Sequence, residues 1–264
     1  MSSIFLENKF SLRAITPNLI TMFAACCGII SITLSAKEEW NSALAAIIIA
    51  GLLDGVDGRV ARALNATSKI GQELDSLADF VNFGVAPGMF MYYWLPAVSP
   101  INSGAIGKTV LMAAVLFYAM CDAFRLARFN SLIDVKTKPY WKHFFLGLPA
   151  PGGAGALITP ALLWIGTRMQ HDWLANVWFG SAVLVIFGLL MASRLPTISA
   201  KSVRIPRNFV IPATAFVVAV IYCAVTKFWF TFAVIGVCYI IAIPISIAAF
   251  VRAKMRFESR TEQK

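Results

Sequence analysis

The sequence contains repeated runs of apolar residues that are long enough to cross a lipid bilayer. Hydrophobic residues make up 59% of the 264-residue chain, and charged residues make up only 14%. A soluble domain carries about 25% charged residues, and a helix needs roughly 17–25 apolar residues to span the hydrocarbon core of a membrane. We therefore predict an integral membrane protein with an all-α fold, a polytopic helical bundle.

The apolar runs predict eight transmembrane helices in one domain that covers residues 1–264. Residues 1–16 mix polar and apolar side chains, which is the pattern of an amphipathic helix on the membrane surface. Thr16 followed by Pro17 predicts that the first span starts here, because proline is favoured at the first helical position. The predicted spans cover approximately residues 18–34, 40–53, 74–95, 109–124, 147–165, 173–192, 209–225 and 228–251.

Basic residues are distributed unevenly between the segments that connect these spans. With eight spans, 19 of the 23 Lys and Arg residues fall on the side that carries both termini, and four fall on the other. Such an excess marks the cytoplasmic side of a membrane protein, so both termini are predicted to be cytoplasmic. Topology and anionic lipid headgroups also explain the net charge of +10, and we expect no nucleic-acid partner.

Four aspartates form two closely spaced pairs at the cytoplasmic ends of the second and third spans. Asp54 and Asp57 make one pair, and Asp75 and Asp79 make the other. Residues three or four apart share a helix face, so packing of the two helices would bring four carboxylates together. Their mutual repulsion would be offset by two divalent cations, and an all-oxygen ligand set favours Mg²⁺ or Mn²⁺.

Carboxylate-held metal pairs are a recurring device in phosphoryl transfer. Arg62 follows Asp54 by about two helical turns and is placed to bind a phosphate. Spacing alone leaves open a structural charge network or the ion pathway of a transporter, because intramembrane acidic residues mark such routes. The one-sided position of the cluster argues against a transporter, and so does the lack of a matching motif in the last four spans.

The pattern D-x2-D-G-x2-A-R-x8-G-x3-D-x3-D runs from Asp54 to Asp79 and resembles the signature of the CDP-alcohol phosphatidyltransferases. The resemblance implies a helical membrane enzyme, a homodimer, that transfers a phosphatidyl group from CDP-diacylglycerol to an alcohol and releases CMP. It implies two divalent cations, with Asp54, Asp57, Asp75 and Asp79 as ligands. It also implies that Asp79 is the catalytic base that deprotonates the acceptor hydroxyl.

The same resemblance assigns residues to the CDP part of the donor. It implies that Gly58, Arg62 and Ser68 contact CDP. The segment PNLIT in the first span is similar to a second nucleotide-contacting segment of the family and adds Asn18 and Thr21. The acyl chains of the donor would then lie between the helices and among the membrane lipids.

Three further segments narrow the choice of acceptor. ELDSLADFVNFGVAPG, CDAFRLARFN and FLGLPAPGGAG resemble the phosphatidylserine synthase branch of the family. This implies L-serine as the acceptor and phosphatidylserine as the product, in the phospholipid biosynthesis of a bacterial or archaeal cytoplasmic membrane. The active site would face the cytoplasm.

A zwitterionic acceptor needs a cation for its carboxylate and a hydrogen-bond acceptor for its ammonium group. Asp122, Arg125 and Arg128 recur every three residues along one helix, and Asn82 lies three residues after Asp79. These four are the predicted serine-binding residues, with an arginine placed to bind the carboxylate. Glycerol 3-phosphate, inositol phosphate and choline remain open as acceptors, and the same arginines could bind the phosphate of the first two.

Overall fold

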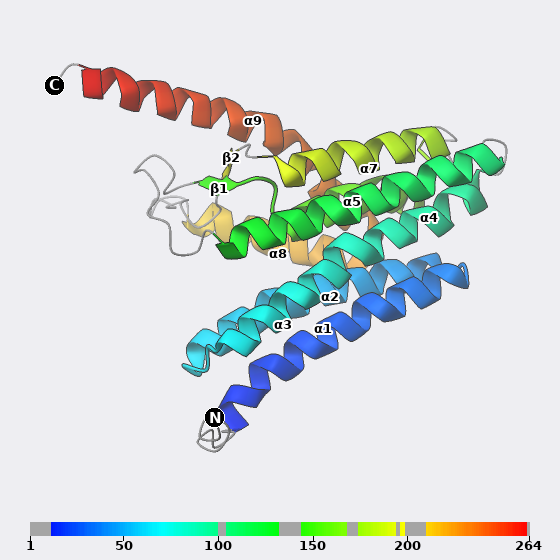
Figure 1. Ribbon diagram of the computed structural model, residues 1–264, viewed down its shortest axis with the longest axis horizontal. Helices are drawn as coiled ribbons and strands as arrows, with labels where there is room; N and C mark the ends of the chain where they lie inside the picture. The colour runs from blue at the N-terminus through cyan, green and yellow to red at the C-terminus, as the bar shows by residue number, and fades with distance from the viewer. Residues whose placement is uncertain are drawn as a thin grey trace, which may run out of the picture. The chain divides into compact units, whose positions relative to one another are not determined.

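The computed structural model is almost entirely helical over the part of the chain that it describes (Figure 1). Its residues fall into two compact units, Met1–Phe90 and Met91–Lys264, and each unit is described by itself below. The described residues are 12–99, 104–131, 144–167, 174–193, 196–198 and 210–262.

The first unit is built around two long helices joined by a tight turn. Helix α1 packs along α2, and it also contacts α3 and the π-helical segment η1. Helix α4 continues the chain into the second unit. The elements are α1 (Leu12–Ala36), α2 (Trp40–Ala63), α3 (Lys69–Asp79), η1 (Phe80–Val85) and α4 (Ala86–Val98).

The second unit consists of helices and one small two-stranded sheet. Helix α5 packs on α7, and α6 packs on α9. Strands β1 and β2 pair in antiparallel register, with Phe144 opposite Ile198. The elements are α5 (Ala105–Ser131), β1 (Phe144–Leu146), α6 (Ala150–Thr167), α7 (Val177–Ala192), β2 (Pro196–Ile198), α8 (Val210–Thr226) and α9 (Phe228–Glu262).

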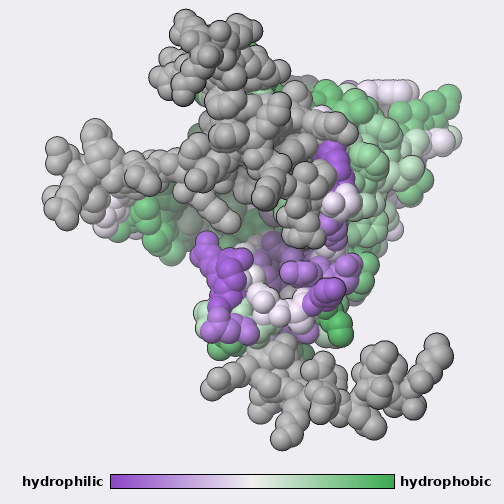
Figure 2. Space-filling model, turned by 60° about the vertical axis from the view of Figure 1, so that its left-hand side comes forward, coloured by the Kyte–Doolittle hydropathy of each residue, from purple (hydrophilic) through white to green (hydrophobic). Residues whose placement is uncertain are grey.

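Among the described residues, each of the eight predicted spans overlaps helical structure, the third with α3, η1 and α4 in succession. Among the described residues, three helical segments are long and apolar enough to cross a membrane: Thr16–Ala36, Ala105–Ser131 and Phe228–Arg252. Large apolar side chains are also exposed on the surface, where hydrophobic residues cover broad areas (green in Figure 2). These features confirm a helical integral membrane protein.

The predicted helix start at Pro17 is wrong, although the candidate membrane span within this helix does begin at Thr16. Helix α1 already begins at Leu12 and encloses Pro17. Pro17 is the sixth residue of this helix, so the helix continues through it with one backbone N–H donor fewer. Of the amphipathic surface helix predicted for residues 1–16, residues 12–16 belong to α1, and residues 1–11 lie outside the described part of the chain.

A π-helical segment directly after Asp79 was not predicted. In η1 the helix carries an extra residue per turn, a feature that is common near functional sites. Segment η1 lies against Gly28 of α1, where an added Cβ would overlap the side-chain oxygen of Asn82. A residue without a side chain therefore allows the two segments to approach closely.

Candidate functional site

The turn between α2 and α3 brings the two aspartate pairs toward each other. Helix α2 ends at Ala63, and Asn65 adopts a left-handed conformation with φ of 50°, which asparagine tolerates better than most residues. Ser68 then caps α3, because its hydroxyl oxygen accepts a hydrogen bond from the Gly71 N–H at 3.0 Å. Local turn and capping chemistry therefore end α2 and begin α3, which packs on α1.

Three of the four predicted metal ligands meet in one cluster. Carboxylate oxygens of Asp54, Asp57 and Asp75 all lie within 4.8 Å of one another. Oxygens this close suit a shared cation, and a purely carboxylate donor set suits a hard divalent ion. The cluster can therefore hold a metal ion.

Asp57 is the most buried member of this cluster, with 3% of its surface exposed. Burial raises the pKa of its carboxyl, and the nearby charge of Asp54 raises it further, while hydrogen bonds from Thr21 and the Gly58 N–H act in the opposite direction. The pKa remains above its ordinary value. A bound cation would remove this penalty, because it stabilises the ionised carboxylate.

Asp79 is not a member of the three-carboxylate cluster. It lies four residues after Asp75, at the last position of α3, and is half-buried. The sequence spacing predicted that all four carboxylates meet, whereas the structure groups three of them. Asp79, the predicted base, lies outside this group on the same helix as Asp75. Asp79 therefore lies next to the cluster but is not grouped with its three carboxylates.

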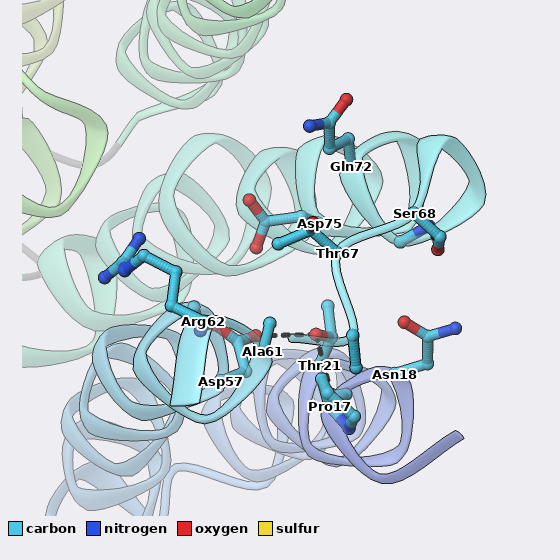
Figure 3. A pocket seen from close by; sticks show the side chains of 13 residues that line it. Pro17, Asn18, Thr21, Asp57, Ala61, Arg62, Thr67, Ser68, Gln72 and Asp75 are labelled. Atoms are coloured by element: carbon cyan, nitrogen blue, oxygen red, sulfur yellow. Dashed lines mark hydrogen bonds between the residues drawn. The ribbon is translucent and has the colours of Figure 1, made fainter. Parts of the chain in front are cut away.

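A cleft of about 190 Å³ opens between α1, α2 and α3 in the first unit (Figure 3). It contains all five residues predicted to contact CDP, together with two members of the carboxylate cluster. It is smaller than the roughly 300–1,000 Å³ of a typical small-molecule pocket, so it would hold only part of a large donor. The lining residues are Pro17, Asn18, Thr21, Asp57, Gly58, Ala61, Arg62, Ala66, Thr67, Ser68, Gly71, Gln72 and Asp75.

Two glycines line this cleft, and they differ in what an added side chain would contact. A Cβ on Gly71 would lie 2.9 Å from Asn18 Oδ1 and 3.1 Å from the Ser68 hydroxyl, so the lack of a side chain allows α1 and α3 to meet there. A Cβ on Gly58 would meet only Arg62, at 3.8 Å. Gly58 is therefore not required by the packing of the protein itself, and its bare surface is available to a ligand.

Thr21 makes a contact that the sequence did not reveal. Its hydroxyl donates a hydrogen bond of 2.6 Å to Oδ2 of Asp57, although the two residues are 36 positions apart. The bond is drawn as a dashed line in Figure 3. No local spacing pattern connects these positions, so only the packing of α1 along α2 could identify the pair.

The predicted serine-binding residues are divided between the two units. Asn82 lies in η1 of the first unit and is fully buried, and its amide has no hydrogen-bond partner among the described residues. In the second unit, Arg125 Nε donates to Asp122 Oδ1 at 3.3 Å. The other oxygen of this buried aspartate has no hydrogen-bond partner within the described ranges.

Arg128 differs from Arg125 in its contacts. Its two terminal nitrogens donate to the main-chain oxygens of Ala192 at 2.7 Å and Ser193 at 2.8 Å. Its guanidinium also lies 5.9 Å from the ring centre of Phe124. Arg128 therefore binds main-chain carbonyl groups, whereas Arg125 pairs with the carboxylate of Asp122.

Comparison with known proteins shows the family of this chain. The sequence model of the CDP-alcohol phosphatidyltransferases matches residues 14–186. A CDP-diacylglycerol–serine O-phosphatidyltransferase of Mycobacterium leprae is 37% identical over 238 residues, 88% of this chain and 74% of the relative. Proteins of the same name from Mycobacterium bovis and Helicobacter pylori are 36% and 35% identical and cover 88% and 71% of this chain, which spans 78% and 73% of their lengths. The chain belongs to the CDP-alcohol phosphatidyltransferase family.

Proposed function

We propose that this protein transfers the phosphatidyl group of CDP-diacylglycerol to the hydroxyl of L-serine and thereby makes phosphatidylserine and CMP. The observation that carries the proposal is the cleft of the first unit, which collects every predicted CDP-contacting residue next to the carboxylate cluster. The names of the relatives support serine as the acceptor.

The donor would bind with its nucleotide in the cleft and its acyl chains in the bilayer. Arg62 supplies a positive charge for a phosphate, and Gly58 allows a close approach to α2. Asn18 and Ser68 provide polar groups for the nucleotide, and Thr21 lines the same cleft while it bonds to Asp57. Asp54, Asp57, Asp75 and Asp79 are the proposed ligands of two divalent cations, Mg²⁺ or Mn²⁺, which when bound would neutralise phosphate charge.

In the proposed reaction, Asp79 takes the proton of the serine hydroxyl. The serine oxygen forms a bond to the β-phosphorus of CDP-diacylglycerol while the bond from that phosphorus to the oxygen of CMP breaks. The half-buried position of Asp79, outside the three-carboxylate cluster, supports its use as a base. Arg62 would stabilise the negative charge of departing CMP.

The acceptor would be held by its two charged groups. We assign its carboxylate to Arg125 and its ammonium group to Asp122, whose second oxygen has no hydrogen-bond partner in the described part of the chain. The buried amide of Asn82 is a further candidate contact. Arg128 was predicted alongside them, but its hydrogen bonds to Ala192 and Ser193 favour a structural role.

We further propose a single catalytic domain with both termini and the active site in the cytoplasm. The distribution of Lys and Arg between the segments supports this orientation, and it gives the site access to soluble serine and CMP. A homodimer in a bacterial or archaeal cytoplasmic membrane is the expected assembly.

An acceptor panel tests the choice of serine. The purified full-length protein is supplied with CDP-diacylglycerol, Mn²⁺ and one of serine, glycerol 3-phosphate, inositol phosphate or choline, and CMP release is measured. We expect release only with serine. Faster release with another alcohol would reassign the acceptor within the family, and metal-coupled ion flux without CMP release would indicate a transporter instead.

A further inference from the structure

We infer that Thr21 is a positioning residue that holds the Asp57 carboxylate in its metal-binding orientation. This inference rests on the proposed function, because it assumes that Asp57 binds a cation. It assigns Thr21 a role different from the nucleotide contact that the sequence suggests.

The first argument is the geometry of the hydrogen bond. The Thr21 hydroxyl lies 2.6 Å from Asp57 Oδ2 and 3.2 Å from the carbonyl oxygen of Pro17. Its single proton favours the nearer and negatively charged acceptor, because charge-assisted hydrogen bonds are shorter and stronger than neutral ones. Since this proton is committed, Thr21 has none left to donate to a nucleotide phosphate or carbonyl.

The second argument is what this bond does to the carboxylate. Asp57 Oδ1 accepts from the Gly58 N–H, and Oδ2 accepts from Thr21. With both oxygens held, rotation of the group is restricted, and its remaining lone pairs can face Asp54 and Asp75 in the cluster. Partners of metal ligands act in this way, and their loss typically weakens metal affinity by 10–100-fold.

The third argument is that both partners are buried. Thr21 is 5% exposed and Asp57 is 3% exposed, so water cannot readily replace the hydroxyl if it is lost. Because α1 packs along α2, the bond also makes the orientation of Asp57 on α2 depend on the position of α1.

The test is a Mn²⁺ titration of the purified full-length protein by isothermal calorimetry without nucleotide. Thr21→Val keeps the side-chain shape and removes the hydroxyl, and we expect it to weaken Mn²⁺ affinity by about 10–100-fold. Thr21→Ser retains the hydroxyl and is expected to restore most of that affinity. Thr33→Val is the matched control, since Thr33 lies on the same helix and, among the described residues, its hydroxyl donates to the carbonyl oxygen of Ile29.

Unchanged Mn²⁺ affinity in Thr21→Val would overturn the inference, as would a loss in Thr21→Val that Thr21→Ser does not reverse. A wild-type protein that fails to bind Mn²⁺ would overturn it as well. If the wild type binds Mn²⁺ with the expected dependence on Thr21 but makes no phosphatidylserine, the proposed function fails and the positioning role stands.

Discussion

The guanidinium of Arg128 joins α5 to the end of α7 through hydrogen bonds to the carbonyl oxygens of Ala192 and Ser193. These carbonyls belong to the last turn of α7 and lack intrahelical partners, and the helix dipole makes this end favourable for a cation. Gly147, with φ of +81°, lies against the carbonyls of Met191 and Ser193, and a Cβ there would be 3.2 Å from Arg128 Nη2. Arg128 therefore organises the fold of the second unit.

Replacement of Arg125 and of Arg128 by lysine should distinguish a residue that binds the acceptor from one that stabilises the fold. Arg128→Lys loses the two-pronged geometry, and a hydrogen bond from a charged group contributes about 1.5–3 kcal/mol, so a clear fall in Tm is expected. Arg125→Lys should raise the KM for serine with little change in Tm. The Tm and the KM for serine are measured for both variants. A raised KM for serine in Arg128→Lys at unchanged Tm would contradict the structural role of Arg128.

Gly58→Ala should weaken the binding of the donor without lowering the stability of the protein. Alanine is more favourable than glycine in a helix by about 0.5–1 kcal/mol, and the new Cβ would meet only Arg62 at 3.8 Å, so Tm should not fall. The methyl group would occupy the wall of the cleft and weaken the binding of CDP-diacylglycerol, read as a raised KM.

Gly55→Ala is the control for this variant, because Gly55 lies on the same helix, has no atom within 4 Å of an added Cβ, and does not line the cleft. It should gain the same stability and keep the wild-type KM. Equal donor KM values for Gly58→Ala and the wild type would show that the nucleotide does not approach α2 at this position.

Removal of divalent metal should destabilise the protein through the carboxylate cluster. A ligand at 100 times its Kd stabilises a fold by about 2.7 kcal/mol, and without it the charges of Asp54, Asp57 and Asp75 repel one another. Addition of EDTA should lower Tm and abolish activity, and Mg²⁺ or Mn²⁺ should restore both. In Asp57→Asn the fall in Tm caused by EDTA should be much smaller, and a fall equal to that of the wild type would place the metal elsewhere.

The helical class and the grouping of three aspartates could be predicted from the sequence for physical reasons. Apolar runs report directly on burial in lipid, and the spacing of Asp54, Asp57 and Asp75 places their side chains on facing helix surfaces. The turn at Asn65 and the cap at Ser68 use residue types suited to those positions. Local chemistry and tertiary structure agree in this region.

Other features depend on contacts between distant residues and could not be predicted. The bond from Thr21 to Asp57 and the contacts of Arg128 each connect different helices. The π-helical segment has no sequence signature, and the start of α1 was misplaced because proline is tolerated early in a helix as well as at its first position. Packing determines each of these features.

The most direct test of the account is product formation by the purified full-length protein with CDP-diacylglycerol, L-serine and Mn²⁺. We predict phosphatidylserine and CMP in equal amounts, no product in EDTA, and a loss of activity in Asp79→Asn, which removes the proposed base but keeps the side-chain shape. The absence of phosphatidylserine, or an unchanged rate in Asp79→Asn, would contradict the proposed reaction.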